Sequence, residues 1–411
     1  MARPDDVSND DKMQQAGEAG SVSAALGAVI RQAVLAQGGW LAFDRFMALA
    51  LYQPGLGYYA NAGRKFGLGP GSGSDFVTAP EMSPLFGRAL AAQVRQALQA
   101  SGSAAVMEFG AGSGALAEAL LDALGEAVQT YEIVDLSGTL RARQQACLAR
   151  FGSRVRWLDR LPEAFDGVIV GNEVLDAMPV QLLHFDGAQW LERGVALAGV
   201  RPQAALPPPP GGDEQSNQVT FAHDAFTWAD RPTALRPPVD GPPASGFVSG
   251  FVPGTVTEIH PQAEAFIRSI AAMLRRGLAL FIDYGFPEQE YYLPQRIGGT
   301  LMCHQAHRAD GNPLLAVGDK DITAHVNFTG IALAAQDAGL AVLGYTSQAR
   351  FLLNCGLVPL LEAATLPERT MAQRLINEHE MGELFKVIAL ARGLPGLDLL
   401  GFAQGDRSHR L

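Results

Sequence analysis

Short apolar runs alternate with amphipathic stretches at helical spacing over the middle of the chain, from residue 105 to about residue 285. The apolar runs have the length of buried strands and span residues 105–109, 131–135, 155–158, 165–171 and 277–285. The stretches that predict helices, with apolar residues three or four positions apart, span residues 115–124, 138–151 and 261–276. Strands that alternate with helices in this way predict an α/β fold with a doubly wound parallel sheet.

The flanking regions follow other patterns. Apolar spacing predicts helices over residues 21–37, 40–51 and 85–98, and the polar residues 1–20 are expected to be disordered. The glycine-dense residues 63–74 predict a mobile flap. Residues 181–200 predict β-hairpins, with Asp186 and Gly187 as a turn. From residue 201 to about 254 proline and glycine are abundant, which predicts a surface insertion that the core does not need.

The C-terminal third predicts further elements of both kinds. Strands are expected around residues 300–308 and 385–391, and helices over residues 329–338 and between 357 and 380. We therefore divide the chain into a disordered N-terminus (1–20), a helical and flap region (21–104), a main α/β domain (105–200 and 255–392), the insertion (201–254) and a C-terminal tail (393–411).

Composition narrows the class of protein. The chain has 411 residues, with 42 Asp and Glu against 31 Lys and Arg, so its formal net charge is −11. This balance argues against binding to nucleic acid or to a membrane surface, which basic patches would indicate. Three cysteines fit a reducing compartment. Because no apolar run reaches the roughly 18 residues of a membrane span, we expect no membrane insertion and a cytoplasmic location.

A glycine loop follows the first strand of the α/β region. Gly110, Gly112 and Gly114 alternate between the run that ends at Phe109 and the helix expected from Ala115. Glycine permits positive φ and lets a ligand approach the backbone without a Cβ in the way. The free N–H groups at the start of the following helix would then face that ligand.

The loop alone does not identify its ligand. Gly110, Gly112 and Ala115 also match the dinucleotide fingerprint. An acid at Glu108 would repel a pyrophosphate but can face a cationic ligand, and Asp135 follows the next strand, where an acid can reach a ribose. These two acids favour S-adenosylmethionine over a nicotinamide or flavin cofactor. A glycine turn with no ligand is the third interpretation.

Other polar residues follow strands of the same predicted sheet. Asn172 and Glu173 follow the strand at 165–171, and Asp283 lies near the end of the strand at 277–285. Ligands of such sheets bind beyond the carboxyl ends of the strands. We therefore expect these residues to meet Glu108 and Asp135 in one crevice.

The chain resembles the MidA-type methyltransferase family over residues 21–392. The resemblance is carried by the segments 54–59 (PGLGYY), 75–81 (DFVTAPE), 108–114 (EFGAGSG), 172–180 (NEVLDAMPV), 283–285 (DYG) and 321–328 (DITAHVNF). It implies a Rossmann-like class I methyltransferase fold with an N-terminal helical extension and β-rich insertions. It also implies the cofactor S-adenosylmethionine and methylation of a protein arginine. The mitochondrial members of that family assist assembly of respiratory complex I and dimethylate an arginine on one of its subunits. Ala111 and Ser113 depart from the proline and arginine frequent in that loop.

The resemblance and the residue chemistry together give candidate site residues. Those expected to bind the cofactor are Thr78, Pro80, Glu108, Gly110, Ala111, Gly112, Gly114, Asp135, Leu136 and Asn172. Those expected to serve catalysis are Glu173, Asn172, Asp176 and Glu81, because carboxylates can hold a guanidinium plane and disperse its charge. The alternative interpretation of Glu173, Asp176 and Glu81 is that they are acids in the first turns of helices.

Partners and metals complete the expectations. Cys303, His304 and His307 lack a fourth ligand for zinc, so we expect no metal. The expected partner is a protein that carries an arginine, with a subunit of respiratory complex I as one candidate, and homodimer formation stays open. A non-catalytic assembly factor with a cofactor-shaped fold is the alternative from outside the enzymes.

Overall fold

A largely parallel sheet forms the centre of the computed structural model, which describes residues 9–61, 77–199, 225–240, 250–305 and 307–411. Its strands lie in the order β15 (Ala341–Ser347), β16 (Phe385–Arg392), β10 (Leu274–Phe286), β5 (Phe165–Asn172), β2 (Ala105–Phe109), β3 (Thr130–Val134) and β4 (Val155–Leu158), and β14 (Val326–Asn327) pairs with β10. Neighbouring strands from β10 to β4 are parallel, whereas β16 runs antiparallel to β10 and to β15. The predicted α/β fold is confirmed.

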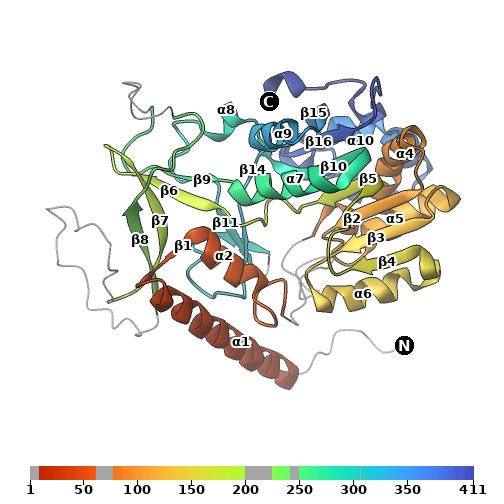
Figure 1. Ribbon diagram of the computed structural model, residues 1–411. Helices are drawn as coiled ribbons and strands as arrows, with labels where there is room; N and C mark the ends of the chain where they lie inside the picture. The colour runs from red at the N-terminus through yellow and green to blue at the C-terminus, as the bar shows by residue number, and fades with distance from the viewer. Residues whose placement is uncertain (1–8, 62–76, 200–224, 241–249, 306) are drawn as a thin grey trace.

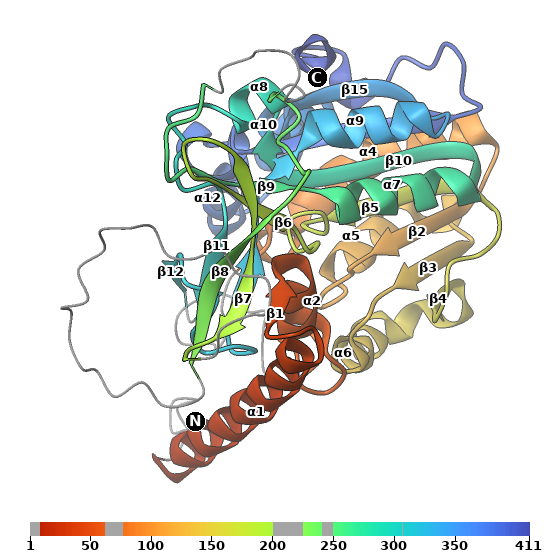
Figure 2. The same ribbon diagram turned by 60° about the vertical axis from the view of Figure 1, so that its left-hand side comes forward.

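Helices cover both faces of this sheet (Figure 1; Figure 2). One face packs against α4 (Pro84–Ser101), α5 (Ala115–Leu124), α6 (Gly138–Leu148), α10 (Gln348–Asn354), α11 (Leu357–Ala363) and α12 (Leu366–Gln373). The opposite face packs against α7 (Pro261–Met273) and α9 (Phe328–Asp337), whose Ile267 and Ile331 are buried. The sheet is therefore doubly wound, and the carboxyl ends of its parallel strands stay open to ligands.

A second, antiparallel sheet lies beside the first. Its strands are β1 (Trp40–Ala42), β7 (Trp190–Leu197), β6 (Gln181–Phe185), β9 (Val256–Ile259) and β8 (Phe226–Pro232). Helices α1 (Asn9–Ala36) and α2 (Phe43–Tyr52) pack against it through side chains such as Ile30 and Phe46. A small sheet of β11 (Met302–Gln305), β12 (Arg308–Asp310) and β13 (Asp321–Thr323) contributes to the same core. The hairpin predicted over 181–200 is confirmed as β6 and β7.

Two expectations for the N-terminal region are wrong. Residues 9–20 are helical and form the first part of α1. A helix that packs on the core further along can continue into a polar segment, because its backbone hydrogen bonds do not require apolar side chains. Residues 40–42 form strand β1 rather than a helix, and they pair with residues 194–196 of β7. That partner lies about 150 positions away along the chain, so local spacing could not indicate it. Residues 1–8 and the flap expected at 63–74 lie outside the described residues.

The insertion at 201–254 is also corrected in part. Strand β8 pairs with β7 along seven positions, and the Trp40 indole donates a hydrogen bond to the Ala229 carbonyl at 2.8 Å. Phe251 packs in a separate apolar cluster around Trp190. The described part of the insertion therefore packs on the core. The sequence did not predict this, because its few aromatic residues are outnumbered by polar residues and prolines. Residues 200–224 and 241–249 are outside the described part.

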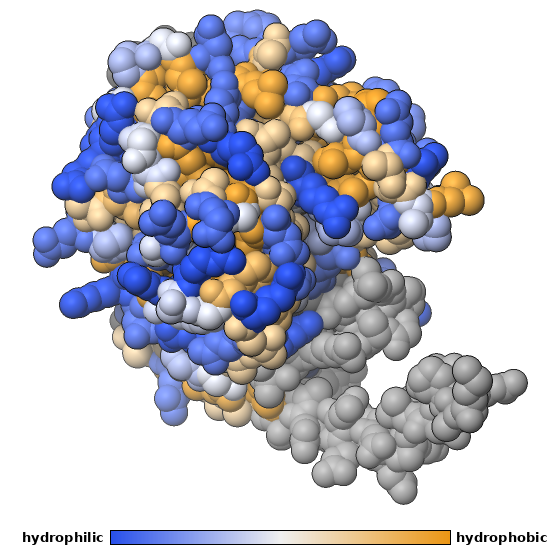
Figure 3. All heavy atoms as spheres, turned by 90° about the vertical axis from the view of Figure 1, so that its right-hand side faces the viewer, coloured by the Kyte–Doolittle hydropathy of each residue, from blue (hydrophilic) through white to orange (hydrophobic). Residues whose placement is uncertain are grey.

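One face of the molecule is mostly hydrophilic. Figure 3 views the side that carries α4, α5 and α6, where hydrophilic side chains predominate and apolar ones occur in scattered groups. In the described part of the chain no helix is both long enough and apolar enough to cross a membrane.

Short helices α3 (Ala79–Met82) and α8 (Glu288–Tyr291) lie near the carboxyl ends of the central strands.

Candidate functional site

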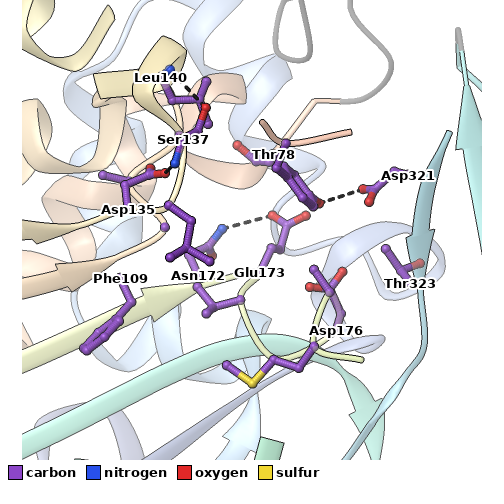
Figure 4. A pocket seen from close by; sticks show the side chains of 18 of the residues that line it. Thr78, Phe109, Asp135, Ser137, Leu140, Asn172, Glu173, Asp176, Asp321 and Thr323 are labelled. Carbon is purple, nitrogen blue, oxygen red and sulfur yellow. Dashed lines mark hydrogen bonds between the residues drawn. The ribbon is translucent and has the colours of Figure 1, made fainter. Parts of the chain in front are cut away.

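A cavity of about 860 Å³ lies at the carboxyl ends of the central parallel strands. Figure 4 shows its side chains arranged around Asn172 and Glu173, at the end of β5. The glycine loop after β2 and Asp135 after β3 line one half. The other half is lined by residues of the N-terminal region and of the small sheet, among them Tyr59 and Asp321. One crevice thus gathers segments from across the whole chain.

The glycine loop adopts the left-handed backbone that its sequence predicts. Gly110, Gly112 and Gly114 have φ values of 63°, 54° and 92°. A Cβ on Gly110 would lie 3.1 Å from Val174 Cγ2, so the loop passes close to the turn after β5. The Gly112 carbonyl accepts a hydrogen bond from Gln144 Nε2 at 3.0 Å, which ties the loop to α6. The loop therefore presents a fixed backbone surface to the cavity.

Asp135 is held in a defined orientation at the end of β3. Its carboxylate accepts hydrogen bonds from the Ser137 backbone N–H at 2.9 Å and from Gln144 Nε2 at 2.7 Å. Ser137 in turn caps α6 through the Leu140 N–H. Next to Asp135, the Leu136 side chain lines the cavity although it is 79% exposed, which places it at the mouth. Burial raises the pKa of Asp135, and these hydrogen bonds oppose the shift.

Glu108 is buried on β2 at the floor of the cavity. Its carboxyl accepts a hydrogen bond from the Tyr131 hydroxyl at 2.6 Å. Burial raises the pKa of Glu108 to about 8, which the hydrogen bond from Tyr131 only partly opposes. A buried acid of this kind gains from a cation placed beside it, because the cation favours the ionised carboxylate.

Glu173 occupies a strained position directly after β5. Its φ of 53° is in the left-handed region that non-glycine residues rarely adopt, and its N–H donates to the Ile282 carbonyl at 2.9 Å. Its carboxyl accepts hydrogen bonds from Asn172 Nδ2 at 3.0 Å and from the Ala79 backbone. Burial, with Asp176 nearby, raises the pKa of Glu173 to about 8. No helix begins among residues 173–180, so the interpretation of Glu173 and Asp176 as acids at a helix start is wrong.

Asp176 lies in the same turn, and its two carboxyl oxygens differ in their contacts. The Tyr284 hydroxyl donates to Oδ2 of Asp176, while Oδ1 is buried and has no hydrogen-bond partner among the described residues. Burial raises the pKa of Asp176 to about 6. Oδ1 of Asn172, also a residue of the cavity wall, is likewise buried and unpartnered within the described chain. Two acceptor oxygens are therefore available to a donor in the cavity.

Glu81 approaches the glycine loop from the opposite wall. It lies in α3, after Thr78 and Pro80, which also line the cavity. Burial raises the pKa of Glu81, and the hydroxyl of nearby Ser113 opposes this rise. Oε2 of Glu81 is buried without a partner in the described part of the chain. Ser113, which stands where the resembled family often has arginine, thus lies close to α3.

Among the predicted site residues only Gly114 does not line the cavity. A Cβ at Gly114 would face the Gln144 backbone at 3.5 Å and Cys147 at 3.6 Å, so this glycine serves the packing of α5 on α6. Asp283, expected in the same crevice, instead lies behind the turn after β5 and is not part of the wall. The sequence predicted that Asp283 lies near the end of a strand, but it could not predict the direction of the side chain.

Several residues of the cavity wall were not among the candidate site residues. Tyr52 and Tyr59 from the N-terminal region stack with ring centroids 5.6 Å apart, and Tyr59 donates to Asp321 Oδ2 at 2.9 Å. Asp321 and Thr323 come from β13. Tyr59 and Asp321 do fall within two of the segments that carry the family resemblance, which was the available signal.

Metal chemistry receives no support from the three-residue pattern at 303–307. Cys303 is buried in the apolar core beside α1 and α2, whereas His304 lines the cavity. Within the described ranges, no group of three or more His, Cys, Asp and Glu side chains could hold a metal ion.

The charge of the cavity fits S-adenosylmethionine, a cofactor that carries a sulfonium and an amino group. The acids of the described wall are Glu81, Glu108, Asp135, Glu173, Asp176 and Asp321, and this part of the wall contains no Lys or Arg. The glycine loop leaves room for a ligand against its backbone. Oxygens of Asn172 and Glu81 that have no partner in the described part of the chain can accept hydrogen bonds.

Comparison with known proteins agrees with this fit. Residues 85–346 match the family described as "Putative S-adenosyl-L-methionine-dependent methyltransferase". A solved structure from Burkholderia thailandensis, described as a "likely methyl transferase" bound to S-adenosyl-homocysteine, is 48% identical with a TM-score of 0.84, over 96% of this chain and 98% of that one. The mouse mitochondrial protein arginine methyltransferase NDUFAF7 is 27% identical over 87% of this chain and 82% of its own. Its Drosophila melanogaster homologue is 24% identical over 85% and 81%.

Proposed function

The chain belongs to the family of S-adenosyl-L-methionine-dependent methyltransferases, and we propose that the group it methylates is a guanidinium nitrogen of a protein arginine. Because the cofactor of this family is S-adenosylmethionine, the nicotinamide and flavin alternatives are excluded. The arginine acceptor is supported by the names of the relatives from mouse and fly and by the chemistry of the cavity.

Residues of the glycine-loop half would hold the cofactor, which supplies an electrophilic methyl group on a sulfonium when bound. The Gly110–Gly112 backbone and Asp135 are suited to the nucleoside and amino acid parts of such a ligand. Glu108 and Glu81 place carboxyl groups beside the same loop.

The observation that carries the arginine proposal is the imbalance of charge in the described cavity wall. Six carboxyl groups converge there without a Lys or Arg among the described wall residues. Burial raises the pKa of five of these groups, Glu81, Glu108, Asp135, Glu173 and Asp176, so each would gain from a cation. S-adenosylmethionine carries one net positive charge, which leaves acids in the other half for a second cation.

An arginine suits this half better than a lysine does. An acidic pocket holds a lysine ammonium in its protonated form, which has no lone pair to attack a methyl group. A guanidinium keeps nitrogen electron density in its protonated form, and carboxylates can draw the positive charge away from one nitrogen. Because Glu173, Asp176 and Asn172 lie together, they can hold a guanidinium plane by several hydrogen bonds.

The roles differ between these residues. Glu173 would bind the guanidinium and stabilise the charge as the nitrogen attacks, since its strained backbone fixes the carboxyl in the middle of the cavity. Oδ1 of Asp176, which has no partner among the described residues, can receive a hydrogen bond and the proton that the methylated nitrogen releases. Asn172 orients Glu173 through Nδ2. Glu81, on the wall near the loop, is the next candidate.

The test uses mass spectrometry of methylated residues. Purified protein with S-adenosylmethionine and an extract from cells that lack the gene should yield methylarginine after acid hydrolysis of the extract proteins. Methyllysine or a methyl ester in its place would contradict the proposed acceptor. Binding of S-adenosylmethionine without any methyl transfer to the extract would instead favour the non-catalytic assembly factor.

We also propose three properties of the protein in its cell. Its substrate is a protein, with a subunit of respiratory complex I as the first candidate, and the number of methyl groups added is to be read from the same hydrolysate. A cytoplasmic location is supported by the small number of cysteines, although the relatives from mouse and fly are named as mitochondrial. Subcellular fractionation tests the location. The third property is formation of a homodimer, which light scattering tests.

A further inference from the structure

Strand β13 presents two different faces, one to the apolar core and one to the cavity. Ile322 is buried against α1 and α2 together with Cys303, its partner on β11. Asp321 and Thr323 point the other way, opposite His304 and Met302, and these four residues line the cavity. Because side chains alternate along a strand, the burial of Ile322 fixes Asp321 on the cavity side. Asp321 is therefore built into the wall.

The carboxylate of Asp321 is held by the N-terminal region. The Tyr59 hydroxyl donates to its Oδ2 at 2.9 Å, and Tyr59 stacks on Tyr52 with their ring planes 18° apart. Tyr52 donates in turn to the Ala177 carbonyl at 2.8 Å. Burial raises the pKa of both tyrosines well above its ordinary value, so both stay neutral donors. A wall of two stacked rings thus joins Asp321 to the turn that carries Asp176.

Asp321 and Asp176 approach the same space from different segments. Both line the same cavity, and, besides burial, the charges of both raise the pKa of Tyr52, Tyr59 and Glu173. Figure 4 shows Asp321 and Asp176 on the same side of Glu173, away from Asp135 and Ser137. Each is oriented by a tyrosine hydroxyl, Asp321 by Tyr59 and Asp176 by Tyr284. Oδ1 of Asp176, which is 5% exposed, remains without a partner in the described chain.

The basic residue next to Asp321 in the sequence serves another contact. Lys320 pairs with Asp310 at 2.6 Å and is not part of the cavity wall. A guanidinium presents five N–H donors in one plane, so two carboxylates can bind two of its edges while an aromatic ring covers its face. An ammonium group has no second edge and no flat face to match this arrangement.

We propose that Asp321 is a second guanidinium-binding carboxylate, which together with Asp176 forms a two-sided clamp against the Tyr52–Tyr59 wall. The proposal rests on the proposed arginine acceptor and extends it. The N-terminal region and the small sheet then select the acceptor, whereas the glycine-loop half holds the cofactor. Asp321 and Tyr59 are the specificity-determining pair.

The test measures binding of N-butylguanidine to the full-length protein saturated with S-adenosylhomocysteine, by calorimetry. Asp321→Asn should weaken this binding about 10- to 100-fold, the effect of removing a charged hydrogen-bond partner. It should change the affinity for S-adenosylhomocysteine less than twofold. Tyr59→Phe should weaken N-butylguanidine binding by a smaller factor, since it releases the carboxylate without removing it. n-Pentylamine should bind more weakly to the wild type than N-butylguanidine does.

The matched control is Asp310→Asn, which removes an acid from the same small sheet but outside the cavity. It should leave N-butylguanidine affinity unchanged. Equal affinity of the wild type and Asp321→Asn for N-butylguanidine would overturn the clamp. If the wild type yields methylarginine but Asp321→Asn keeps its KM for the protein substrate, the clamp fails while the arginine acceptor stands. Absence of N-butylguanidine binding to the wild type would overturn the clamp, and absence of methylarginine from the hydrolysate would overturn the acceptor with it.

Discussion

The Oδ2 atom of Asp283, at the end of β10, accepts the backbone N–H of Leu175 at 2.9 Å. The N–H groups of Val174 and Asp176 donate to the same oxygen at 3.1 and 3.2 Å. One buried carboxylate therefore holds the turn that begins at Glu173 in a left-handed conformation. Asp283 acts on the cavity through this turn, because the positions of the Glu173 and Asp176 carboxyls depend on the turn's shape.

Replacing Glu173 by glutamine should separate catalysis from cofactor binding. Glu173→Gln keeps the size of the side chain and removes its charge, so methyl transfer should fall by about 10²–10³, as for loss of one preorganised electrostatic contact. The affinity for S-adenosylmethionine should stay within a few-fold. Single-turnover rates and calorimetry measure the two quantities.

The complementary variant is Asp135→Ala, which should lose cofactor affinity first, because Asp135 lies in the glycine-loop half. Asp159→Ala, an exposed acid paired with Arg141, is the control and should affect neither quantity. Near-full turnover in Glu173→Gln would remove Glu173 from the mechanism and make Glu81 the next residue to test.

Methyl transfer should become faster as pH rises through the range of about 6 to 8. Burial raises the pKa of Asp176 to about 6 and that of Glu173 to about 8, and only the ionised carboxylates bind a guanidinium. The profile of kcat/KM against pH should therefore have two rising limbs. Glu173→Gln should lack the upper limb and keep the lower. A profile that is flat from pH 6 to 9 would contradict this assignment.

The same pKa shift should act on stability in the opposite direction. The folded-state pKa of Glu173 lies above its ordinary value of 4.5, so the unfolded chain loses this proton first as pH rises. The contribution of Glu173 to the free energy of unfolding should fall between about pH 4.5 and 8 in the ligand-free protein. Urea titrations should show a smaller decline over this range in Glu173→Gln than in the wild type.

Gly112 should be required for cofactor binding for a reason besides its left-handed backbone: a side chain there would occupy space that the ligand needs. Gly112→Ala adds a Cβ to the loop surface that faces the cavity and should reduce S-adenosylmethionine affinity at least about tenfold by occupying ligand space. Gly102→Ala is the matched control, since Gly102 is also left-handed, with φ of 68°, and has open space around it. Each variant should lose about 1–2 kcal/mol of stability. Equal cofactor affinity in the two variants would show that Gly112 matters only for the turn.

The insertion should divide into a dispensable and a required part. Ala198 N–H donates to the Ala225 carbonyl at 2.9 Å, so a short linker can replace residues 200–224, and this variant should unfold at the wild-type temperature. Trp228→Ala, in β8, should lose about 2 kcal/mol, less than a fully buried tryptophan does, because Trp228 packs on Phe43 and is only half-buried. Equal stability of Trp228→Ala and the wild type in urea would show that β8 does not support the core.

The sequence by itself determined the elements whose signals are local. The apolar runs and the glycines at 110–114 predicted β2, the loop and α5, because strand burial, left-handed backbone and helical spacing are each determined over a few residues. The alternation of strands and helices then predicted the doubly wound sheet. It also placed Asp135, Asn172 and Glu173 at one edge, since the carboxyl ends of parallel strands meet there.

Only the tertiary structure decided what depends on partners far apart in the sequence. Residues 40–42 and 226–232 become strands because β7 offers them hydrogen bonds, which their own spacing does not reveal. Asp283 turns toward the backbone of residues 174–176 rather than into the cavity. Tyr59 and Asp321, 262 positions apart, meet because the N-terminal region and β13 share one apolar core. The side of the cavity that the N-terminal region and the small sheet line is made of such contacts, so strand and helix patterns did not predict it.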